Sequence, residues 1–288
     1  MASKKNKLKT NAAGDFYVDS NCINCGVSRW IAPDIFDEKD RKSSVYRQPN
    51  TPEERKRALM AAVACPTYSI GAENDSIAEG YKFYPFRIDK NVYHCGFHAS
   101  SSFGATSYFI TREEGNVLVD SPRFAKPLVK RLEEMGGIKF MFLTHRDDVA
   151  DHKKYHEHFG CERILHADDI TAKTNDVERK IDGTQPVAID DDLLAIPVPG
   201  HTKGSACLLY KEKFLFTGDH LAWSGNLNHV SAFRNHCWYD WKTQIASMEK
   251  LGVYRFEWIL PGHGRRCSFP AIEMARQLHI CINWMKSG

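Results

Sequence analysis

The sequence contains no long hydrophobic run, no excess of one charge and no repeated or low-complexity segment. No stretch of about 18 consecutive apolar residues occurs, so no transmembrane helix is expected. The 39 Lys and Arg residues nearly balance the 36 Asp and Glu residues, and the formal net charge is +3. This balance gives no electrostatic reason to expect nucleic acid or an anionic membrane as a partner. With 42% hydrophobic and 26% charged residues, the composition excludes a disordered chain, a collagen and a coiled coil.

The first residues do not have the pattern of a secretory signal. Residues 1–14 are polar, include Lys4, Lys5, Lys7 and Lys9, and lack an apolar core segment. We therefore expect an intracellular protein of the cytoplasm or the plastid stroma, since a chain that has lost a transit peptide would look the same. The nine cysteines cannot all pair within one chain, because their number is odd. In such a compartment they are expected to be thiols or metal ligands rather than disulfides.

The character of the sequence changes near residue 80. Residues 15–70 contain three cysteines in a pattern, and a polar stretch at 73–80 is typical of a linker. From residue 82 onward, apolar runs typical of strands alternate with segments of helical periodicity, which predicts a layered α/β domain. We predict strands at 117–119, 140–143, 193–196, 206–210, 214–216 and 258–260, and helices at 124–135, 241–251 and 271–285. The predicted organisation is a module of residues 1–80 followed by a domain of residues 81–288.

Metal-ligand residue types follow four of the predicted strands. They are His145, Asp147, Asp148, Asp151 and His152 after 140–143, His201 after 193–196, Asp219 after 214–216 and His263 after 258–260. Strands that end at a common edge bring such loops together. Imidazole and carboxylate groups are good ligands for zinc, iron or manganese. Two metals about 3.5–4 Å apart, bridged by a carboxylate such as Asp219, can hold a hydroxide and polarise a carbonyl or phosphoryl group.

Several short motifs resemble those of the metallo-β-lactamase superfamily, in which the glyoxalase II-like hydrolases are nearest. They are Phe103-Gly104-Ala105-Thr106-Ser107-Tyr108-Phe109-Ile110, Val119-Asp120, Thr144-His145, Pro199-Gly200-His201-Thr202, Gly218-Asp219 and Pro261-Gly262-His263-Gly264. The resemblance covers residues 82–288 and implies an αββα sandwich with two divalent metal ions at one edge. It implies the following ligands: His145, His201 and Asp219 for one metal, and Asp151, His152, Asp219 and His263 for the other.

The loop after the predicted strand at 140–143 departs from the family pattern. The pattern His-x-His-x-Asp-His stands here as His145-Arg146-Asp147-Asp148-Val149-Ala150-Asp151-His152, with two extra residues before the final pair. Asp147 keeps the two-residue offset from His145 and is our choice for the second ligand position, with Asp148 as the alternative. An additional carboxylate hardens the site and favours iron or manganese over zinc. Flavodiiron proteins of the same superfamily carry a carboxylate at that place, so zinc and iron both remain candidates.

The cysteine pattern of the N-terminal module resembles a single-cluster bacterial-type ferredoxin. The pattern consists of Cys22, Cys25, and Cys65 followed by Pro66. The resemblance implies a small α+β fold in which thiolates bind one [4Fe–4S] cluster. Ser28 stands where that pattern has a third cysteine, so the module offers three thiolates. The alternatives are a fourth cysteine from elsewhere, such as Cys95, a zinc site of the three cysteines, or a docking domain with free thiols.

The ligand set predicts a binuclear metallohydrolase. In this hypothesis a metal-bound hydroxide attacks a small-molecule ester, thioester or lactone-type substrate, and Asp151 orients the nucleophile. One alternative is a non-haem iron redox enzyme of the sulfur dioxygenase or oxygen reductase type, which would need a redox partner. Another is a non-catalytic metal-binding protein, although no ligand position holds an apolar residue. The sequence leaves the oligomeric state open.

Other residues allow more than one interpretation. The segment 220–239 is either a substrate-side loop or a packed aromatic loop, and Arg234 within it could bind a substrate carboxylate. His94 and His98 precede the first motif and could border the site. His156, His158 and His166 lie in or after a further expected helix, and we expect them to have packing or solvent-exposed roles.

Overall fold

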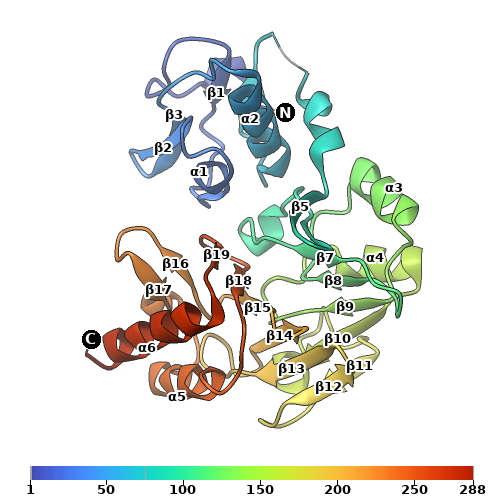
Figure 1. Cartoon of the computed structure of the whole chain (residues 1–288). Coiled ribbons are helices and arrows are strands. Elements are labelled where there is room, and N and C mark those ends of the chain that lie inside the picture. Colours follow the sequence, from blue (N-terminus) through green and yellow to red (C-terminus); the bar gives the residue numbers. More distant parts are fainter. Residues whose placement is uncertain (1, 75, 288) are drawn as a thin grey trace. The chain divides into compact units, whose positions relative to one another are not determined.

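The computed structural model describes residues 2–74 and 76–287 (Figure 1). Contacts between residues divide the chain into two compact units. Unit 1 comprises Met1–Asn116 and Pro122–Ile138, and unit 2 comprises Val117–Ser121 and Lys139–Gly288. The predicted linker at 73–80 contains Asp75, which lies outside the described residues, and Ile77–Phe83 form a 3₁₀ helix, η2. The predicted division at residue 80 stays a prediction.

Unit 1 consists of short strands and helices. Its strands are β1 (Phe16–Val18), β2 (Phe36–Lys39), β3 (Lys42–Val45), β4 (Ile70–Ala72), β5 (Phe86–Asp89), β6 (Val92–His94) and β7 (Tyr108–Ile110). Its helices are α1 (Val27–Ile31), α2 (Pro52–Ala64) and α3 (Lys126–Glu134), with the 3₁₀ helices η1 (Lys4–Asn6) and η3 (Ser100–Ser102). β1 pairs with β4, β2 pairs with β3, and β6 pairs with both β5 and β7, in each case antiparallel.

Helix α2 supplies one wall of the core around the cysteine pattern. Thr51 caps the helix by accepting a hydrogen bond from the backbone N–H of Glu54, as is typical of a helix N-terminus. All residues of Ala58–Ala64 are buried, and this part of the helix packs in one cluster with strands β1 and β3. The helix ends before Cys65, because Pro66 disfavours helical geometry at the residue that precedes it. The proline thereby places the third motif cysteine at the end of α2.

Residues from both sides of position 80 pack together in unit 1. The Tyr84 hydroxyl donates a hydrogen bond to the carbonyl oxygen of Met60 over 3.1 Å. Gly104 has a φ of +86° and lies against Cys25, so that a Cβ at this position would be 3.0 Å from the Cys25 Cβ. The segment that follows the predicted boundary therefore forms part of the surroundings of the cysteine pattern.

Unit 2 is built around two sheets. The strands β8 (Val117–Val119), β9 (Phe140–Phe142), β10 (Glu162–His166) and β11 (Arg179–Ile181) pair in parallel in this order. The second sheet has the order β12 (Val187–Asp190), β13 (Leu193–Pro197), β14 (Ala206–Tyr210), β15 (Phe214–Gly218), β18 (Trp258–Pro261) and β19 (Cys267–Ser268). A separate hairpin is formed by β16 (Ala222–Ser224) and β17 (His229–Ser231). The helices are α4 (His152–Phe159), α5 (Trp241–Leu251) and α6 (Ala271–Ser287), with the 3₁₀ helices η4 (Ala167–Asp169) and η5 (Arg234–His236).

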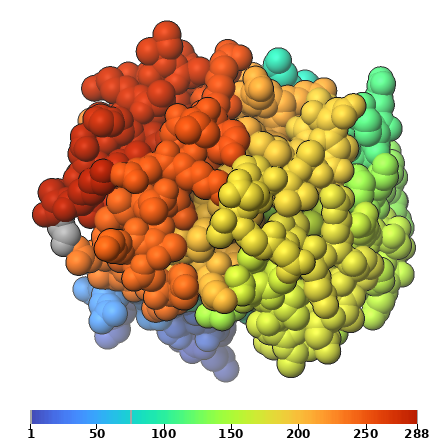
Figure 2. Space-filling model, turned by 90° about the horizontal axis from the view of Figure 1, so that it is seen from below, coloured from blue at the N-terminus to red at the C-terminus, as the bar shows by residue number. Residues whose placement is uncertain are grey.

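The predicted strands and helices are confirmed. All residues of β14 and β15 are buried, as apolar runs of this length predict. Helices α5 and α6 lie beside the second sheet (Figure 1), and Met248 of α5 and Leu278 of α6 belong to one buried cluster with side chains of that sheet. Figure 2 shows β12 and β13, in yellow, beside α5, in orange, on one face of unit 2. In the part of the chain that the structure describes, no helix has the length and apolar character needed to cross a membrane.

Arg163 on β10 is a buried charge with a full set of acceptors. Its side chain contacts Glu178 through two hydrogen bonds, Nη2 to Oε1 at 2.7 Å and Nε to Oε2 at 3.1 Å. Nη2 also donates to the carbonyl oxygen of Asp176 over 2.6 Å, and Nη1 donates to Nδ1 of His152 over 3.2 Å. The planar guanidinium thus ties β10, the loop before β11 and the first turn of α4 together.

The Glu178 carboxylate gives the fold an acid-sensitive contribution to stability. Burial raises its pKa, but the hydrogen bonds and charge of Arg163 outweigh burial and lower the pKa to about 2. Because the folded pKa lies below the unfolded value, this stabilisation is fully present above about pH 4.5 and is lost as the pH falls toward about 2. We expect the free energy of unfolding in urea to fall more steeply through this window in the wild type than in Glu178→Gln. Parallel pH profiles of the two proteins would contradict this expectation.

Candidate metal centre

The metal-ligand residues of unit 2 lie just past the carboxyl ends of four strands. His145 follows β9, His201 follows β13, Asp219 follows β15 and His263 follows β18. β15 and β18 are parallel neighbours, so the residues after them meet: His263 Nδ1 lies 2.8 Å from Asp219 Oδ1. The loop after β9 reaches the second sheet, where the Ala206 N–H donates to the carbonyl oxygen of Thr144 over 2.9 Å. Both sheets therefore deliver ligand residues to one edge of the unit.

Two groups of side chains share His145 and lie within the reach of a metal ion. The ligand atoms of His145, Asp147 and His201 are all within 4.8 Å of one another, as are those of His145, Asp148 and Asp219. Asp219 Oδ2 lies 3.8 Å from Nε2 of both His145 and His201. Asp147 Oδ2 lies 3.7 Å from His201 Nε2. The structure therefore brings together five of the predicted ligands, His145, Asp147, His201, Asp219 and His263, and adds Asp148.

Several atoms of this cluster are buried and make no hydrogen bond. They are Nε2 of His145, Nε2 of His201 and both carboxylate oxygens of Asp148. Buried polar atoms in proteins almost always have a partner, because leaving them without one is costly. A cation among the imidazole nitrogens and carboxylates would satisfy all of them at once. The residues present therefore fit a metal ion, because their buried ligand atoms have no hydrogen-bond partner in the protein.

The rings that point Nε2 into the cluster are held by their other nitrogen. The Nδ1–H of His201 donates to the carbonyl oxygen of His236 over 2.6 Å. The Nδ1–H of His145 donates to Oγ1 of Thr144 over 3.0 Å, and that hydroxyl donates in turn to the carboxylate of Asp120. Such partners fix the tautomer and leave Nε2 as the metal-binding nitrogen.

Gly218 permits the close approach of β15 to the Thr144–His145 turn. Its φ is +49°, and a Cβ there would lie 2.8 Å from the Thr144 Cβ. Only glycine adopts this conformation without strain and leaves room for the threonine. Gly218 thus allows the chain to turn close to Thr144, and this turn positions the carboxylate of Asp219.

The electrostatics of the cluster favour a bound cation. Burial lowers the pKa of His145 to about 4, so its imidazole is neutral near pH 7 and can act as a ligand. Burial and the nearby Asp219 charge raise the pKa of Asp148 well above its usual range. Burial also raises the pKa of Asp219, but His263, His145 and His201 outweigh it and lower that pKa below its usual range. A metal ion would offset the repulsion between these two carboxylates.

Asp151 and His152 are placed outside the cluster. His152 Nε2–H donates to the carbonyl oxygen of Lys173 over 3.2 Å, and Nδ1 accepts from Arg163. Asp151 precedes α4, is about a quarter exposed and forms an ion pair with Lys154 at 2.8 Å. Neither belongs to the two groups of close ligand atoms. Their assignment as metal ligands, and that of Asp151 as catalytic residue, stays a prediction.

The sequence assigns no individual role to three residues of the site, which all lie in the segment 220–239. The carbonyl group of His236 holds His201, but any residue type could supply a carbonyl. His220 is buried beside the cluster, and neither ring nitrogen makes a hydrogen bond. Burial and the charge of His201 lower the pKa of His220 to about 3, which keeps it neutral. Trp238 is 58% exposed, and its ring centre lies 6.2 Å from that of His201, so an apolar surface borders the cluster.

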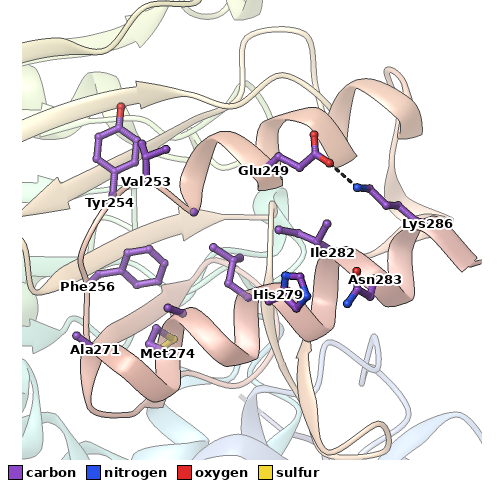
Figure 3. A pocket seen from close by; sticks show the side chains of 13 residues that line it. Glu249, Val253, Tyr254, Phe256, Ala271, Met274, His279, Ile282, Asn283 and Lys286 are labelled. Carbon is purple, nitrogen blue, oxygen red and sulfur yellow. Dashed lines mark ion pairs between the residues drawn. The ribbon is translucent and has the colours of Figure 1, made fainter.

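The hollow between α5 and α6 is separate from these ligands (Figure 3). It has a volume of about 450 Å³ and is lined mainly by apolar side chains such as Val253, Phe256 and Ile282. Figure 3 shows Glu249 reaching from α5 toward Lys286 on α6, and this ion pair has an N–O distance of 2.6 Å. None of the clustered metal-ligand residues lines this hollow.

The three motif cysteines of unit 1 line one cavity. Cys22, Cys25 and Cys65 share it with Ser28 and Ser43. All three are free thiols. Cys95 is buried at another place and does not line this cavity.

Solved structures identify the fold. The BLEG-1 B3 metallo-β-lactamase is 18% identical with a TM-score of 0.52, over 67% of this chain and 99% of that chain. VMB-1 is 17% identical with a TM-score of 0.53, over 70% and 95%. FIM-1 from Pseudomonas aeruginosa, a metallo-β-lactamase in its mono-zinc form, is 19% identical with a TM-score of 0.51, over 67% and 92%. The chain has a metallo-β-lactamase fold. This confirms the predicted fold class.

The family model that matches the N-terminal part is the 4Fe-4S single cluster domain of Ferredoxin I, over residues 18–72. This range contains all three motif cysteines and Ser28. The match supports the predicted ferredoxin-like module ahead of the metallo-β-lactamase fold. A search of the curated proteins found no relative.

Proposed function

We propose that this chain is a metal-dependent hydrolase of a small-molecule ester, thioester or lactone. The observation that carries the proposal is the convergence of unsatisfied buried atoms of His145, His201 and Asp148 on the Asp219 carboxylate. A purely structural cluster would be expected to satisfy these atoms with protein donors and acceptors. The metallo-β-lactamase fold supports the proposal, because the ligand residues follow the carboxyl ends of its strands and so gather at one edge of the unit.

We assign two metal positions to this cluster. One would use His145, Asp147 and His201 with Asp219, and the other would use Asp148 and His263 with Asp219. When bound, two such ions supply a nucleophilic hydroxide at neutral pH and polarise the substrate carbonyl. The orienting role predicted for Asp151 passes in this proposal to Asp148, because Asp148 is the buried carboxylate beside His145. The exposed ring of Trp238 would contact the apolar part of the substrate.

Variants of Asp148 and Asp151 test which of these two aspartates belongs to the metal centre. We expect Asp148→Asn to weaken metal binding by at least about 10–100-fold, because it removes an anionic oxygen from the buried cluster. Asp151→Asn should retain the metal content of the wild type, because Asp151 faces Lys154 at the start of α4. Metal per chain, measured by elemental analysis after dialysis against graded metal concentrations, decides the matter. Loss of metal from the Asp151 variant alone would refute the assignment of Asp148.

The reaction is tested on the purified full chain with a panel of small esters, thioesters and lactones. Hydrolysis should stop when a chelator removes the metal and return when zinc or iron is added back. Elemental analysis of anaerobically purified protein identifies the metal. Hydrolysis that persists in metal-free protein would refute the proposal.

The donor set also supports a second candidate, a non-haem iron redox enzyme. Asp147, Asp148 and Asp219 contribute as many carboxylates to the cluster as there are histidines, and such hard oxygen ligands suit iron. Consumption of oxygen by protein with stoichiometric iron, without hydrolysis of any compound in the panel, would favour this candidate over the hydrolase.

A further inference from the structure

Asp169, the last residue of η4, is a fully buried carboxylate that belongs to neither group of clustered metal-ligand atoms. It accepts three hydrogen bonds. Oδ2 accepts from the Thr202 hydroxyl over 2.5 Å and from the backbone N–H of Arg146 over 3.0 Å. Oδ1 accepts from the backbone N–H of Gly204 over 2.8 Å. These donors offset the cost of burying the carboxylate charge, and they come from two different loops.

Two of these donors directly follow histidines of the candidate metal centre. Arg146 is the residue after His145, and Thr202 is the residue after His201. The two imidazole rings lie edge to face, with their centres 4.7 Å apart. Because both donors bind the same oxygen of Asp169, this carboxylate fixes the loop after β9 relative to the loop after β13. It therefore controls how far apart the two rings can lie.

The loop after β13 is a compact turn that is attached to Asp169. Within the loop, the backbone N–H of Thr202 donates to Oγ of Ser205 over 3.0 Å, and the N–H of Gly200 donates to the Thr202 carbonyl oxygen over 3.0 Å. Gly204 lies against Asp169 so closely that a Cβ there would be 2.8 Å from the Asp169 Cγ. A turn that is closed by its own hydrogen bonds moves as one piece, so its attachment to Asp169 also positions His201.

The neighbouring Asp168 contacts the same loop at the surface. Its side chain is 41% exposed and forms an ion pair with Lys203 at 2.7 Å. Asp168 and Asp169 are thus adjacent carboxylates on one short helix that contact adjacent parts of one loop. Only the buried one contacts the residues that follow His145 and His201 directly, so the pair provides a matched comparison.

We propose that Asp169 is a positioning residue of the metal centre, which holds His145 and His201 at the separation that one metal position requires. Asp169 does not contact the ion itself. The proposal rests on the metal centre of the proposed function but not on its hydrolytic reaction. Asparagine at this position would place an NH₂ group where one carboxylate oxygen accepts, so at least one donor would lose its acceptor. Loss of such an outer contact typically weakens metal binding by about 10–100-fold.

The experiment titrates the metal-free full chain with Co²⁺ and follows its visible absorption, which depends on the ligands and geometry of the ion. Absorption that is absent from His145→Ala is assigned to the centre. We expect Asp169→Asn to bind Co²⁺ about 10–100-fold more weakly than the wild type, with altered absorption bands. Asp168→Asn should stay within about twofold of the wild type, because it removes only an exposed ion pair.

Two variants of Thr202 test the same contact from the other side. Thr202→Val removes the hydroxyl that donates to Asp169 and should also weaken Co²⁺ binding, whereas Thr202→Ser keeps a hydroxyl and should restore the affinity. Thr202→Val combined with Asp169→Asn should cost less than the two single losses together, because both changes break one contact. The valine and serine variants decide the question if Asp169→Asn fails to fold.

Urea unfolding of the metal-free variants separates positioning from stability. A carboxylate with a purely structural role would lower the free energy of unfolding and leave the Co²⁺ affinity of the folded protein unchanged, and this result would overturn the proposal. A wild type that binds no Co²⁺ at the centre would overturn it as well. Protein that hydrolyses no compound of the panel but shows the expected losses of Co²⁺ affinity would refute the hydrolase and support the role of Asp169.

Discussion

Replacement of Asp219 by alanine is expected to empty the candidate metal centre and to lower kcat/KM by about 10³-fold or more. Asp219 is the carboxylate that both proposed metal positions share, with Oδ2 3.8 Å from Nε2 of His145 and His201. Loss of both ions removes several kcal/mol of transition-state stabilisation, and about 1.4 kcal/mol corresponds to a factor of ten. Elemental analysis and turnover of the best substrate of the panel, measured on the same preparation, test this expectation.

Asp168→Ala is a matched control for this variant. Asp168 lies in the same unit but forms an exposed ion pair with Lys203 at 2.7 Å, so its loss should leave metal content and turnover near those of the wild type. Thermal unfolding of both variants after chelation shows whether the fold is retained. If Asp219→Ala kept two metals and its activity, the proposed centre would be refuted.

The second large effect is expected for stability. Arg163→Leu should lower the free energy of unfolding by about 3–5 kcal/mol, because it breaks a buried charge network and removes the side-chain donors of three acceptor groups. These acceptors are the carboxylate of Glu178, the carbonyl of Asp176 and Nδ1 of His152. Urea unfolding of metal-free protein is the appropriate measurement, since bound metal would add its own stabilisation.

Arg276→Leu is the control for the arginine variant. Arg276 on α6 is 64% exposed and pairs with Glu273 on the surface, and such pairs contribute about 0–1 kcal/mol. The double variant Arg163→Leu with Glu178→Gln should recover part of the loss, because it removes the carboxylate charge that Arg163 no longer offsets. Equal losses for the two arginine variants would show that the Arg163 network contributes no more than a surface pair.

The strands and the edge of the site could be predicted from local sequence. Runs such as 206–210 and 214–216 are apolar throughout because β14 and β15 are buried on both faces, and the ligand residues directly follow strand ends. In this chain, as in other layered α/β folds, a residue just past the end of a strand lies at the carboxyl edge of a sheet. For this reason the order of residues along the chain is enough to predict that His201, Asp219 and His263 lie at one edge.

The loop at 145–152 could not be resolved in the same way. Its two extra residues leave open whether Asp147 or Asp148 takes the second ligand position, and spacing alone does not decide between them. In the structure both Asp147 and Asp148 lie within ligand reach of His145. His152 is instead held by a long-range contact, since Arg163, eleven positions later, binds its ring, and α4 begins at His152. Contacts of this kind depend on how β10 packs and leave no pattern in the local sequence.

The contacts across residue 80 bear on whether the first part of the chain can pack without the second. Gly104 belongs to a motif of the metallo-β-lactamase type, yet it covers Cys25, and Tyr84 anchors on the backbone of Met60. A chain cut at residue 80 would lose both contacts, and a Cβ at position 104 would approach the Cys25 Cβ to 3.0 Å. The two parts of the sequence that meet at residue 80 therefore depend on each other for their packing.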